Sequence, residues 1–341
     1  MQEAPAIPPN GHAEVEATVL ICTFNRAHDL ERTLKTLSRI KARFTWDVIV
    51  VDNNSTDQTS EVVHSFATEF AVPTHYLFEG RQGKSNALNT GMNRARANII
   101  VFTDDDVEMP EGWLEAAVRP LLDRSDIDYT GGPVRPAWGA PRPSWLDENG
   151  NLGGTIAVKD HGTVPFIFEE QRKTPLGVNM AVRRSLIERI GGFRPDLGRN
   201  GRSLLGQEQA EFFYRSRRVG ACGLYVPDMW LTHAVPATRL TRDYFRRWWF
   251  WKGISHARLH RIHGRTELDL DLSEVPRVAG IPRYLFRGAL SNVLGWTTSS
   301  IMARPHEQAE HAMMLAYFFG YLREGLRNLR YRTSNVAITG R

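Results

Sequence analysis

The segment Ile99-Ile-Val-Phe-Thr-Asp-Asp-Asp106 joins a compact apolar run to three consecutive carboxylates. A short run that is mostly β-branched or aromatic is typical of a buried strand. Residues i and i+2 of an extended chain point the same way, so Asp104 and Asp106 can converge on one ion. Such oxygen ligands suit Mg²⁺ or Mn²⁺, which commonly bridge protein carboxylates and phosphates. The alternative is a solvated acidic turn before a helix near Trp113, because carboxylates are favourable at a helix N-terminus.

Three further apolar runs precede this segment, and amphipathic or polar stretches separate them. They are Thr18–Cys22, Val48–Val51 and His75–Phe78. Strands that alternate with helices predict an α/β fold, with a mostly parallel central sheet and helices on both faces. Ligands of such sheets bind beyond the carboxyl ends of the strands, so we expect the chemistry in the loops after Val51 and Thr103.

Two loops next to the acidic triplet suit a phosphorylated ligand. Asp52 ends the second run, where an acid can accept hydrogen bonds from a base or a ribose; Asp, Asn and Ser are also turn formers, so a simple turn is the alternative. The segment Gly80–Asn89 places glycines, cations and amides before a helix. Backbone N–H groups and the helix dipole favour an anion there. The spacing is not that of an ATPase phosphate loop.

The ordered set of these motifs resembles glycosyltransferase family 2. The resemblance rests on Thr18–Arg26, Val48–Asp57, Gly83–Gly91, Phe102–Asp106, Gly177–Arg184, Gly191–Phe193, Leu205–Glu208, Val226–Asp228 and His233. It implies the GT-A fold, a nucleotide-diphosphosugar donor and inversion at the anomeric carbon. We therefore predict a disordered lead-in over residues 1–16 and a GT-A nucleotide-sugar-binding catalytic domain over 17–240. A helical, basic and aromatic C-terminal region would extend over 241–341.

The resemblance also implies roles for individual positions. The donor nucleotide would be bound by Thr23, Asn25, Arg26, Asp52, Asn54, Lys84, Asn86, Asp104 and Asp105. The metal, Mn²⁺ or Mg²⁺, would be held by Asp104, Asp106 and His233, although a lone histidine is also commonly structural. Asn179 and Arg183 lie where an acceptor could be reached, and solvated surface arginine is the alternative for Arg183.

The catalytic base is where the sequence departs from the family pattern. The second acid expected after Gly206 is replaced by Gln209, and a glutamine amide is too weakly basic to act as a general base. Glu208 is one candidate after a small change of register, and Glu211, about one helical turn away, is another. The third alternative is an acceptor that is already anionic and needs no strong base.

The C-terminal region is strongly basic. Residues 242–341 carry 16 Lys and Arg against 8 Asp and Glu, within a chain of net charge +5. The stretches 244–252 and 312–322 are rich in aromatic and apolar residues but too short to span a bilayer, which takes ~20 residues. Aromatic rings beside cations favour a membrane surface; the alternative is packing on the catalytic domain or a homodimer interface. We expect an anionic membrane surface as a partner and no nucleic acid.

The N-terminus lacks the features of a signal peptide, so we expect a cytoplasmic protein, peripheral on the inner face of the membrane. The acceptor would be a glycan, a lipid-linked sugar or a small molecule. Gln209 leaves a non-catalytic sugar-nucleotide or polysaccharide-binding protein as the rival function. A nucleotidyltransferase is a second rival, which the segment Thr23–Arg26 disfavours because it lacks glycine. Residues 131–175 predict irregular connecting structure with a hairpin.

Overall fold

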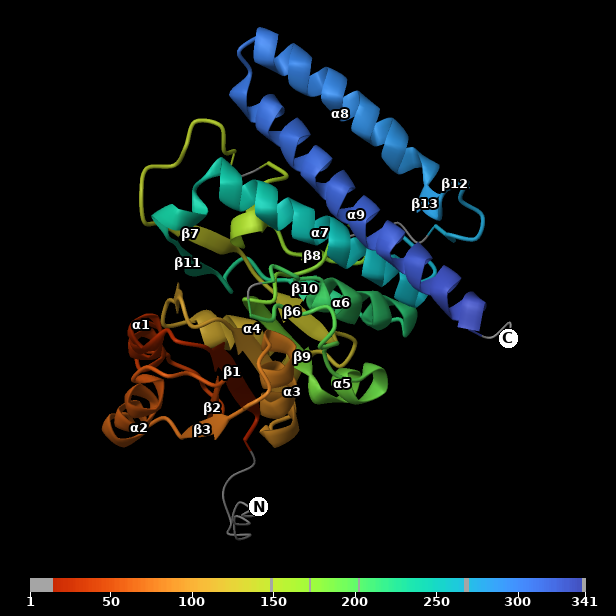
Figure 1. The fold of residues 1–341 in the computed structure, drawn as a ribbon. Coiled ribbons are helices and arrows are strands. Elements are labelled where there is room, and N and C mark those ends of the chain that lie inside the picture. The colour runs from red at the N-terminus through yellow and green to blue at the C-terminus, as the bar shows by residue number, and fades with distance from the viewer. Residues whose placement is uncertain (1–14, 148–149, 172, 202, 267–269, 339–341) are drawn as a thin grey trace.

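An eight-stranded sheet with the order β3-β2-β1-β4-β9-β6-β10-β8 forms the centre of the fold (Figure 1). The computed structural model describes residues 15–147, 150–171, 173–201, 203–266 and 270–338, so nearly all of the predicted lead-in lies outside the described residues. The strands are β1 (Ala17–Thr23), β2 (Trp46–Asp52), β3 (Thr74–Phe78), β4 (Ile99–Thr103), β6 (Tyr129–Gly131), β8 (Phe166–Ile167), β9 (Asn179–Arg183) and β10 (Gly223–Tyr225). β3, β2, β1 and β4 are parallel, and β9 runs antiparallel to β4 and β6.

Helices cover both faces of this sheet, as the sequence predicted. They are α1 (Ala27–Leu37), α2 (Thr59–Glu69), α3 (Lys84–Arg94), α4 (Trp113–Asp123), α5 (Arg184–Ile190) and α6 (Glu208–Arg218). Successive side chains of a strand point to opposite faces, so each buried strand contributes to two cores. Val19 of β1 packs with α1, α2 and α4, whereas Leu20 packs with α3, α5 and α6.

A second sheet, β5-β11-β7, stands beside the carboxyl end of β4. Its strands are β5 (Val107–Glu108), β7 (Val134–Trp138) and β11 (Leu231–Val235). Of the hairpin expected within residues 131–175, the described residues form only the antiparallel bridge between Val134 and Lys159. The strands of this segment pair outside it, β7 with β11 and β8 with β10. The antiparallel pairing of β11 with β5 sets His233 opposite Val107, next to the acidic triplet.

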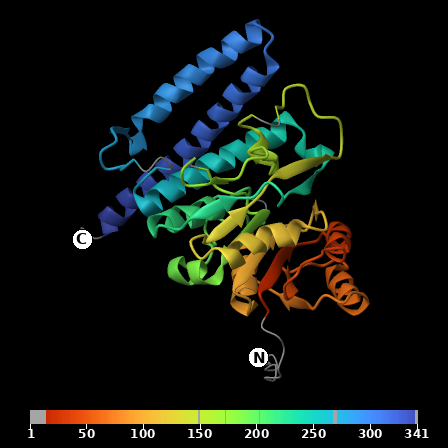
Figure 2. The ribbon, with the colours of Figure 1, turned by 180° about the vertical axis from the view of Figure 1, so that it is seen from behind.

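The C-terminal region is a stack of long helices, as predicted (Figures 1 and 2). Its elements are η2 (Ala237–Arg239), α7 (Arg242–His263), β12 (Arg277–Val278), β13 (Ile281–Pro282), α8 (Arg283–Ile301) and α9 (Pro305–Ile338), and the short η1 (Gly153–Ile156) packs under α7. α7 lies nearest the central sheet, α9 crosses α7 on the side away from the sheet, and α8 is outermost. Two glycines permit this crossing: a Cβ at Gly253 would lie 2.0 Å from Tyr317 O, and one at Gly320 would lie 1.8 Å from Phe250 O.

None of the helices in the described part of the chain combines the length and the apolar content that a bilayer crossing requires.

Candidate active site

A cavity of about 380 Å³ opens where the carboxyl ends of β1 and β4 face the start of α3, the start of α6 and the start of α7. Parallel strands end at one edge of a sheet, so residues far apart in sequence meet there. Eight of the residues predicted to form the site line this cavity: Thr23, Arg26, Lys84, Asp104, Asp105, Asp106, Glu208 and His233. The other predicted residues do not line it.

Asp104, Asp106 and His233 form a cluster in the cavity. One ligand atom from each lies within 4.8 Å of the others. The pairing of β11 with β5 builds this arrangement, and the Ala234 N–H donates to Asp106 O at 2.9 Å. His233 Nε2 lies 3.2 Å from Asp106 Oδ1, yet Asp106 Oδ1 and His233 Nδ1 are buried and make no hydrogen bond within the described residues. Unsatisfied buried polar atoms are costly, so this set fits a divalent cation.

Arg26 and Thr23 hold the carboxylates of the triplet in place. Asp105 Oδ2 accepts from Thr23 Oγ1 at 2.7 Å, and Arg26 Nη1 donates to Asp105 Oδ1 at 2.9 Å and to Asp106 Oδ2 at 2.6 Å. Burial raises the pKa of Asp105 to about 6, against the opposing effect of Arg26. Burial also acts to raise the pKa of Asp106, but His233 and Arg26 outweigh it and keep that pKa well below its usual range.

Lys84 brings a cation to the other side of the triplet. Its Nζ lies 2.5 Å from Asp104 Oδ1. Burial acts to lower the pKa of Lys84, but Asp104 reverses the effect and the pKa is raised. The backbone N–H groups of Gly83 and Lys84 donate to Asn53 Oδ1 and Arg199 O. The expectation that free backbone N–H groups bind an anion here is therefore wrong for Gly83 and Lys84. In this segment the side-chain charge of Lys84 is the group that can attract an anion.

Glu208 faces the cavity from the first turn of α6. Its side chain is buried, and Oε2 has no hydrogen-bond partner among the described residues. Burial raises the pKa of Glu208, while Lys84 and Arg199 act in the opposite direction. A desolvated carboxylate with a raised pKa is the usual state of a general base.

Gln209 has a structural role that an acid could not fill. Its amide nitrogen donates to Pro175 O, and its Oε1 accepts from the Gly177 N–H at 2.7 Å. A carboxylate has no hydrogen to donate, so it would lose the first of these bonds. Gln209 thereby fixes the segment whose residues Leu176, Gly177 and Val178 line the cavity.

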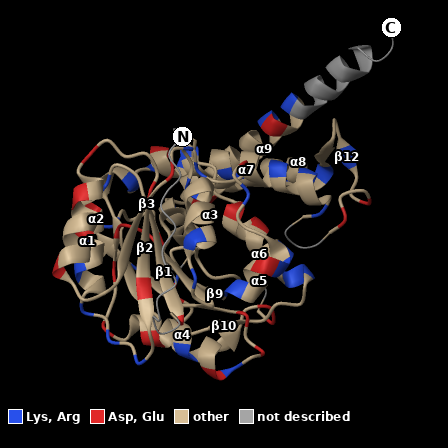
Figure 3. Ribbon diagram, turned by 90° about the horizontal axis from the view of Figure 1, so that it is seen from below, with Lys and Arg blue, Asp and Glu red and all other residues tan. Residues whose placement is uncertain are grey.

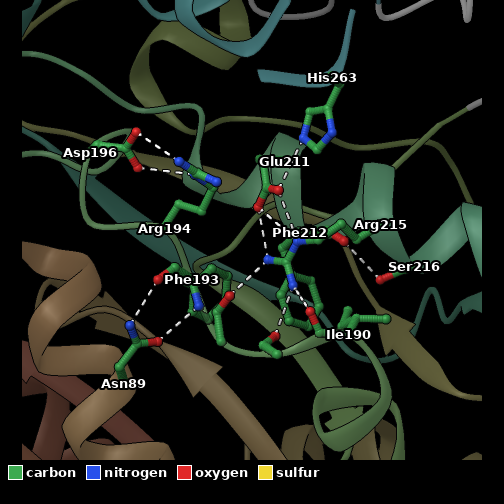
Figure 4. Close-up of polar contacts among 12 residues, drawn as sticks. Asn89, Ile190, Phe193, Arg194, Asp196, Glu211, Phe212, Arg215, Ser216 and His263 are labelled. Atoms are coloured by element: carbon green, nitrogen blue, oxygen red, sulfur yellow. Dashed lines mark hydrogen bonds and ion pairs between the residues drawn. The ribbon is translucent and has the colours of Figure 1, made fainter. Parts of the chain in front are cut away.

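Glu211 does not reach the cavity, which corrects its placement as a candidate base. It is 1% exposed and accepts from Arg215 Nε at 2.9 Å and from Arg215 Nη2 at 2.8 Å, with His263 Nε2 3.1 Å away (Figure 4). Arg215 in turn donates to Gly192 O at 2.7 Å. Glu211 therefore anchors the arginine that ties α6 to the turn after α5.

Asn179 and Arg183 do not line the cavity, which corrects their assignment to an acceptor. Asn179 is fully buried: it accepts from Trp113 Nε1 at 2.9 Å and donates to Pro133 O at 2.9 Å. Arg183 Nε donates to Ile127 O at 2.7 Å. Both side chains therefore join elements at the sheet edge, and neither lines the cavity.

The remaining predicted donor residues do not line the cavity: Asn25, Asp52 and Asn54 lie at or just beyond the ends of β1 and β2, and Asn86 lies in the first turn of α3. Asp52 is buried, accepting from the Ser55 N–H at 2.8 Å and from Tyr76 Oη at 2.8 Å. Asn25 and Asn54 are exposed turn residues with φ of 51° and 70°. Asn86 donates to Arg81 O at 3.3 Å. Asn53, which the sequence reading passed over, is the residue of the second loop that lines the cavity.

A second wall of the cavity comes from residues that the sequence reading did not assign to it. Tyr244 and Trp248 of α7 line the cavity together with Arg239 and the segment 154–157. Residues at i and i+4 share one side of a helix, so the spacing of Tyr244 and Trp248 is the sequence feature that places both on the same wall. Phe245 and Trp249 are buried in a core, and Trp249 Nε1 donates to Thr155 Oγ1 at 3.0 Å. At Phe245 and Trp249 the alternative of packing within the protein therefore applies.

Comparison with known proteins agrees with this geometry. The model of the family Glycosyl transferase family 2 matches residues 18–191. Glycosyltransferase AglE of Haloferax volcanii is 27% identical over 180 residues, 52% of this chain and 55% of the relative, so the match spans about half of that protein. Glucosyl-dolichyl phosphate glucuronosyltransferase of the same organism is 25% identical over 246 residues, 71% of this chain and 76% of the relative.

Solved structures share the fold. The mannosyltransferase PcManGT of Pyrobaculum calidifontis, solved with GDP-Man and Mn²⁺, superposes with a TM-score of 0.61 at 20% identity, over 93% of this chain and 89% of that one. GalNAc-T7, solved with UDP, GalNAc and Mn²⁺, superposes with a TM-score of 0.52 at 15% identity, over 78% of this chain and 57% of that one.

Proposed function

This chain belongs to glycosyl transferase family 2 and is a glycosyltransferase of GT-A fold, as its sequence predicted, and we propose that it transfers a sugar with inversion from a nucleotide-diphosphosugar to a glycan or lipid-linked acceptor. The observation that carries the proposal is the cavity itself. Its triplet side holds Asp104, Asp106 and His233, and Glu208 lines the same cavity. Asp106 Oδ1 and His233 Nδ1 in the cluster, and Glu208 Oε2, are buried polar atoms without a hydrogen bond in the described residues.

We propose that Asp104, Asp106 and His233 hold Mn²⁺ or Mg²⁺ against the donor diphosphate. The bound cation would neutralise negative charge on the departing diphosphate. Lys84, 2.5 Å from Asp104 Oδ1, would move to a phosphate oxygen as the donor enters and so exchange one anionic partner for another. The nucleotide roles of Asp52, Asn54, Asn25 and Asn86 remain predictions, and Asn53 joins them as a cavity residue.

Glu208 would act as the general base. It would take the proton of an acceptor hydroxyl as the hydroxyl oxygen bonds to the anomeric carbon, while the bond from that carbon to the diphosphate oxygen breaks on the opposite face. A single displacement of this kind inverts the anomeric configuration. Burial, which raises the pKa of Glu208, makes it a stronger proton acceptor than a solvated glutamate.

The aromatic wall supports a sugar as the acceptor. Tyr244 and Trp248 line the cavity and would stack on the apolar C–H face of a pyranose, and Arg239, whose Nη2 lies 3.9 Å from Asp106 Oδ2, would pair with an acceptor phosphate. Two relatives are named for lipid-linked sugars: the Haloferax glucuronosyltransferase, and a Campylobacter jejuni glucosyltransferase named for GalNAc(5)-diNAcBac-PP-undecaprenol. We propose an acceptor of the same class. A location on the inner face of a membrane and a homodimer remain predictions.

The test is a thermal-shift screen of nucleotide-diphosphosugars with and without Mn²⁺, because a ligand that binds the folded state raises Tm by mass action. The sugar selected there is then offered with acceptors, and proton NMR reads the anomeric configuration of the product. We expect metal-dependent stabilisation by one donor and an inverted product. Retained configuration would refute the mechanism. Metal-dependent donor binding with neither transfer nor donor hydrolysis would favour the rival function of a non-catalytic binding protein.

A further inference from the structure

Helix α8 is the outermost element of the molecule. It packs along α9 and against β13, and it lies on the side of α9 that faces away from the catalytic sheet (Figures 1 and 2). A helix in this position needs only one apolar side, facing α9.

The side of α8 that faces away from α9 is nevertheless apolar. Leu290, Leu294 and Ile301 are 65%, 62% and 81% exposed, and Val293, Trp296 and Met302 are exposed as well. Leu290, Val293, Leu294 and Ile301 recur at a spacing that keeps them on one side of a helix. Single exposed apolar residues are ordinary, but a continuous row of them on one helix marks a surface that binds something.

The charge on α8 itself has one sign. From residue 275 to residue 303 the chain contains Arg277, Arg283 and Arg287 and no Asp or Glu, whereas the next arginine, Arg304, is paired with Glu307 at 3.3 Å. Arg283 and Arg287 continue the row toward the start of α8, since 283, 287, 290 and 294 follow one another at intervals of three or four residues. In Figure 3 the ribbon of α8 accordingly carries blue and no red.

The end of this row lies near the wall of the active site that α7 forms. α9 starts directly after α8, and its first turns lie against the start of α7: Arg242 Nη1 donates to Gln308 Oε1 at 3.1 Å. Ala309 and Met313 share a core with Phe245. Ile301 and Met302 therefore lie at the same end of the helical stack as Tyr244 and Trp248.

We infer that this outward side of α8 is a docking surface for an anionic phospholipid membrane, on which α8 lies parallel to the plane of the bilayer. The leucines and Ile301 would enter the acyl boundary, and the arginines would pair with headgroup phosphates. A second copy of the chain fits less well, because α8 offers no carboxylate to pair with the arginines of a partner α8. Membrane binding by this surface does not depend on the proposed function. Only the idea that it brings the active site to a lipid-linked acceptor rests on that function.

This surface is not the one that the sequence pattern indicated. Of the predicted stretch 312–322, Phe318 and Tyr321 are buried against neighbouring helices, although Met314 and Phe319 remain exposed. The membrane surface thus moves from the aromatic stretches to α8, where apolar residues are spaced by Ser, Thr, Asn and Gly.

The experiment is flotation of the full chain with vesicles of phosphatidylcholine, with and without phosphatidylglycerol. We compare the wild type with L290S/L294S and with R283Q/R287Q; all four positions are exposed, so folding is retained. The matched controls are V164S/V219S and R39Q/R96Q, which change exposed residues of the same kinds elsewhere. Loss of two arginines at a charged surface should weaken binding by about 30-fold, at ~1 kcal/mol per residue.

We expect the wild type and both controls to float only with the anionic vesicles, and both α8 variants to lose flotation. Equal flotation of wild type and α8 variants, or none by the wild type, would overturn the inference. Sedimentation without lipid separates the rival occupant: a wild-type dimer that L290S/L294S turns into a monomer, without flotation of either, would assign the surface to a second copy. Donor hydrolysis of all variants should match the wild type, which keeps this outcome distinct from failure of the proposed function.

Discussion

Two variants, E208Q and E211Q, show which of the two candidate glutamates is the general base. The two residues lie in the first turns of one helix and both are buried. Their surroundings differ: Glu208 Oε2 is unsatisfied among the described residues, whereas Glu211 is held by Arg215 and His263. The pair is therefore a matched test, because the chemical change is identical.

E208Q should lower kcat by at least ~100-fold, the usual scale for loss of a general base. Its stability should stay equal or rise at neutral pH. Because burial raises the pKa of Glu208 above the value of the unfolded chain, the protonated form is favoured by folding. The stability that this group contributes is present below its unfolded pKa and is lost as the pH rises through its folded pKa. A neutral glutamine removes that loss.

E211Q should do the opposite, with a lower Tm and a kcat near that of the wild type. Breaking a buried ion pair costs ~3–5 kcal/mol when the remaining charge is stranded. Arg215 is 21% exposed and keeps the carbonyl oxygens of Gly191 and Gly192, so about 2 kcal/mol is the expected loss. For a chain of this size that loss lowers Tm by about 3 °C.

The assays are initial rates below the unfolding range, pH–rate profiles and differential scanning fluorimetry. The wild-type rate should fall on the acid side as the pH drops through the raised pKa of Glu208, because the base must be ionised. E211Q should keep that limb, and E208Q should lack it. Near-normal turnover by E208Q, or a loss of turnover by E211Q at full folding, would refute the assignment of the base.

Three other substitutions address other parts of the molecule. H233N should reduce the Mn²⁺-dependent rise in Tm with donor by at least half, and an unchanged rise would remove His233 from the cluster. W248A should raise the acceptor KM about tenfold, for a lost stacking contact of ~1 kcal/mol or more, while donor hydrolysis stays normal; W230A, which changes a tryptophan that lies outside the cavity and stacks with Arg135, is its control. G320A should destabilise by ~1–3 kcal/mol through overpacking, whereas G288A, where an added Cβ meets nothing within 4 Å, should be neutral or stabilising, and chemical denaturation distinguishes the two.

The parts of the site that lie at strand ends could be predicted from the sequence. Ile99–Thr103 is a buried strand and the acidic triplet follows it, so local pattern and parallel topology together place the triplet at the sheet edge, with Asp104 beside Lys84. Asn179 and Glu211 could not be judged in this way. A polar residue at a strand start or on a first helical turn has the same local pattern whether it faces a cavity or the core. Trp113, which pairs with Asn179, is 66 residues away, and His263, which joins the nearby Arg215 at Glu211, is 52 residues away.

The sequence could not show which aromatic residues of α7 face the core and which face the cavity, for a similar reason. Their division between the two explains why the C-terminal helices belong to the site. Phe245 and Trp249 are buried in a core that α7 shares with α9. Tyr244 and Trp248, each one residue earlier and also four residues apart, line the cavity. The same helix reaches the segment that carries the base: His256 Nε2 lies 3.0 Å from Gln207 Oε1, one residue before Glu208. A cut near Arg239 would therefore remove one wall of the cavity and a support of α6, rather than detach an accessory tail. If donor hydrolysis survived that cut undiminished, the helices would have no part in placing Glu208.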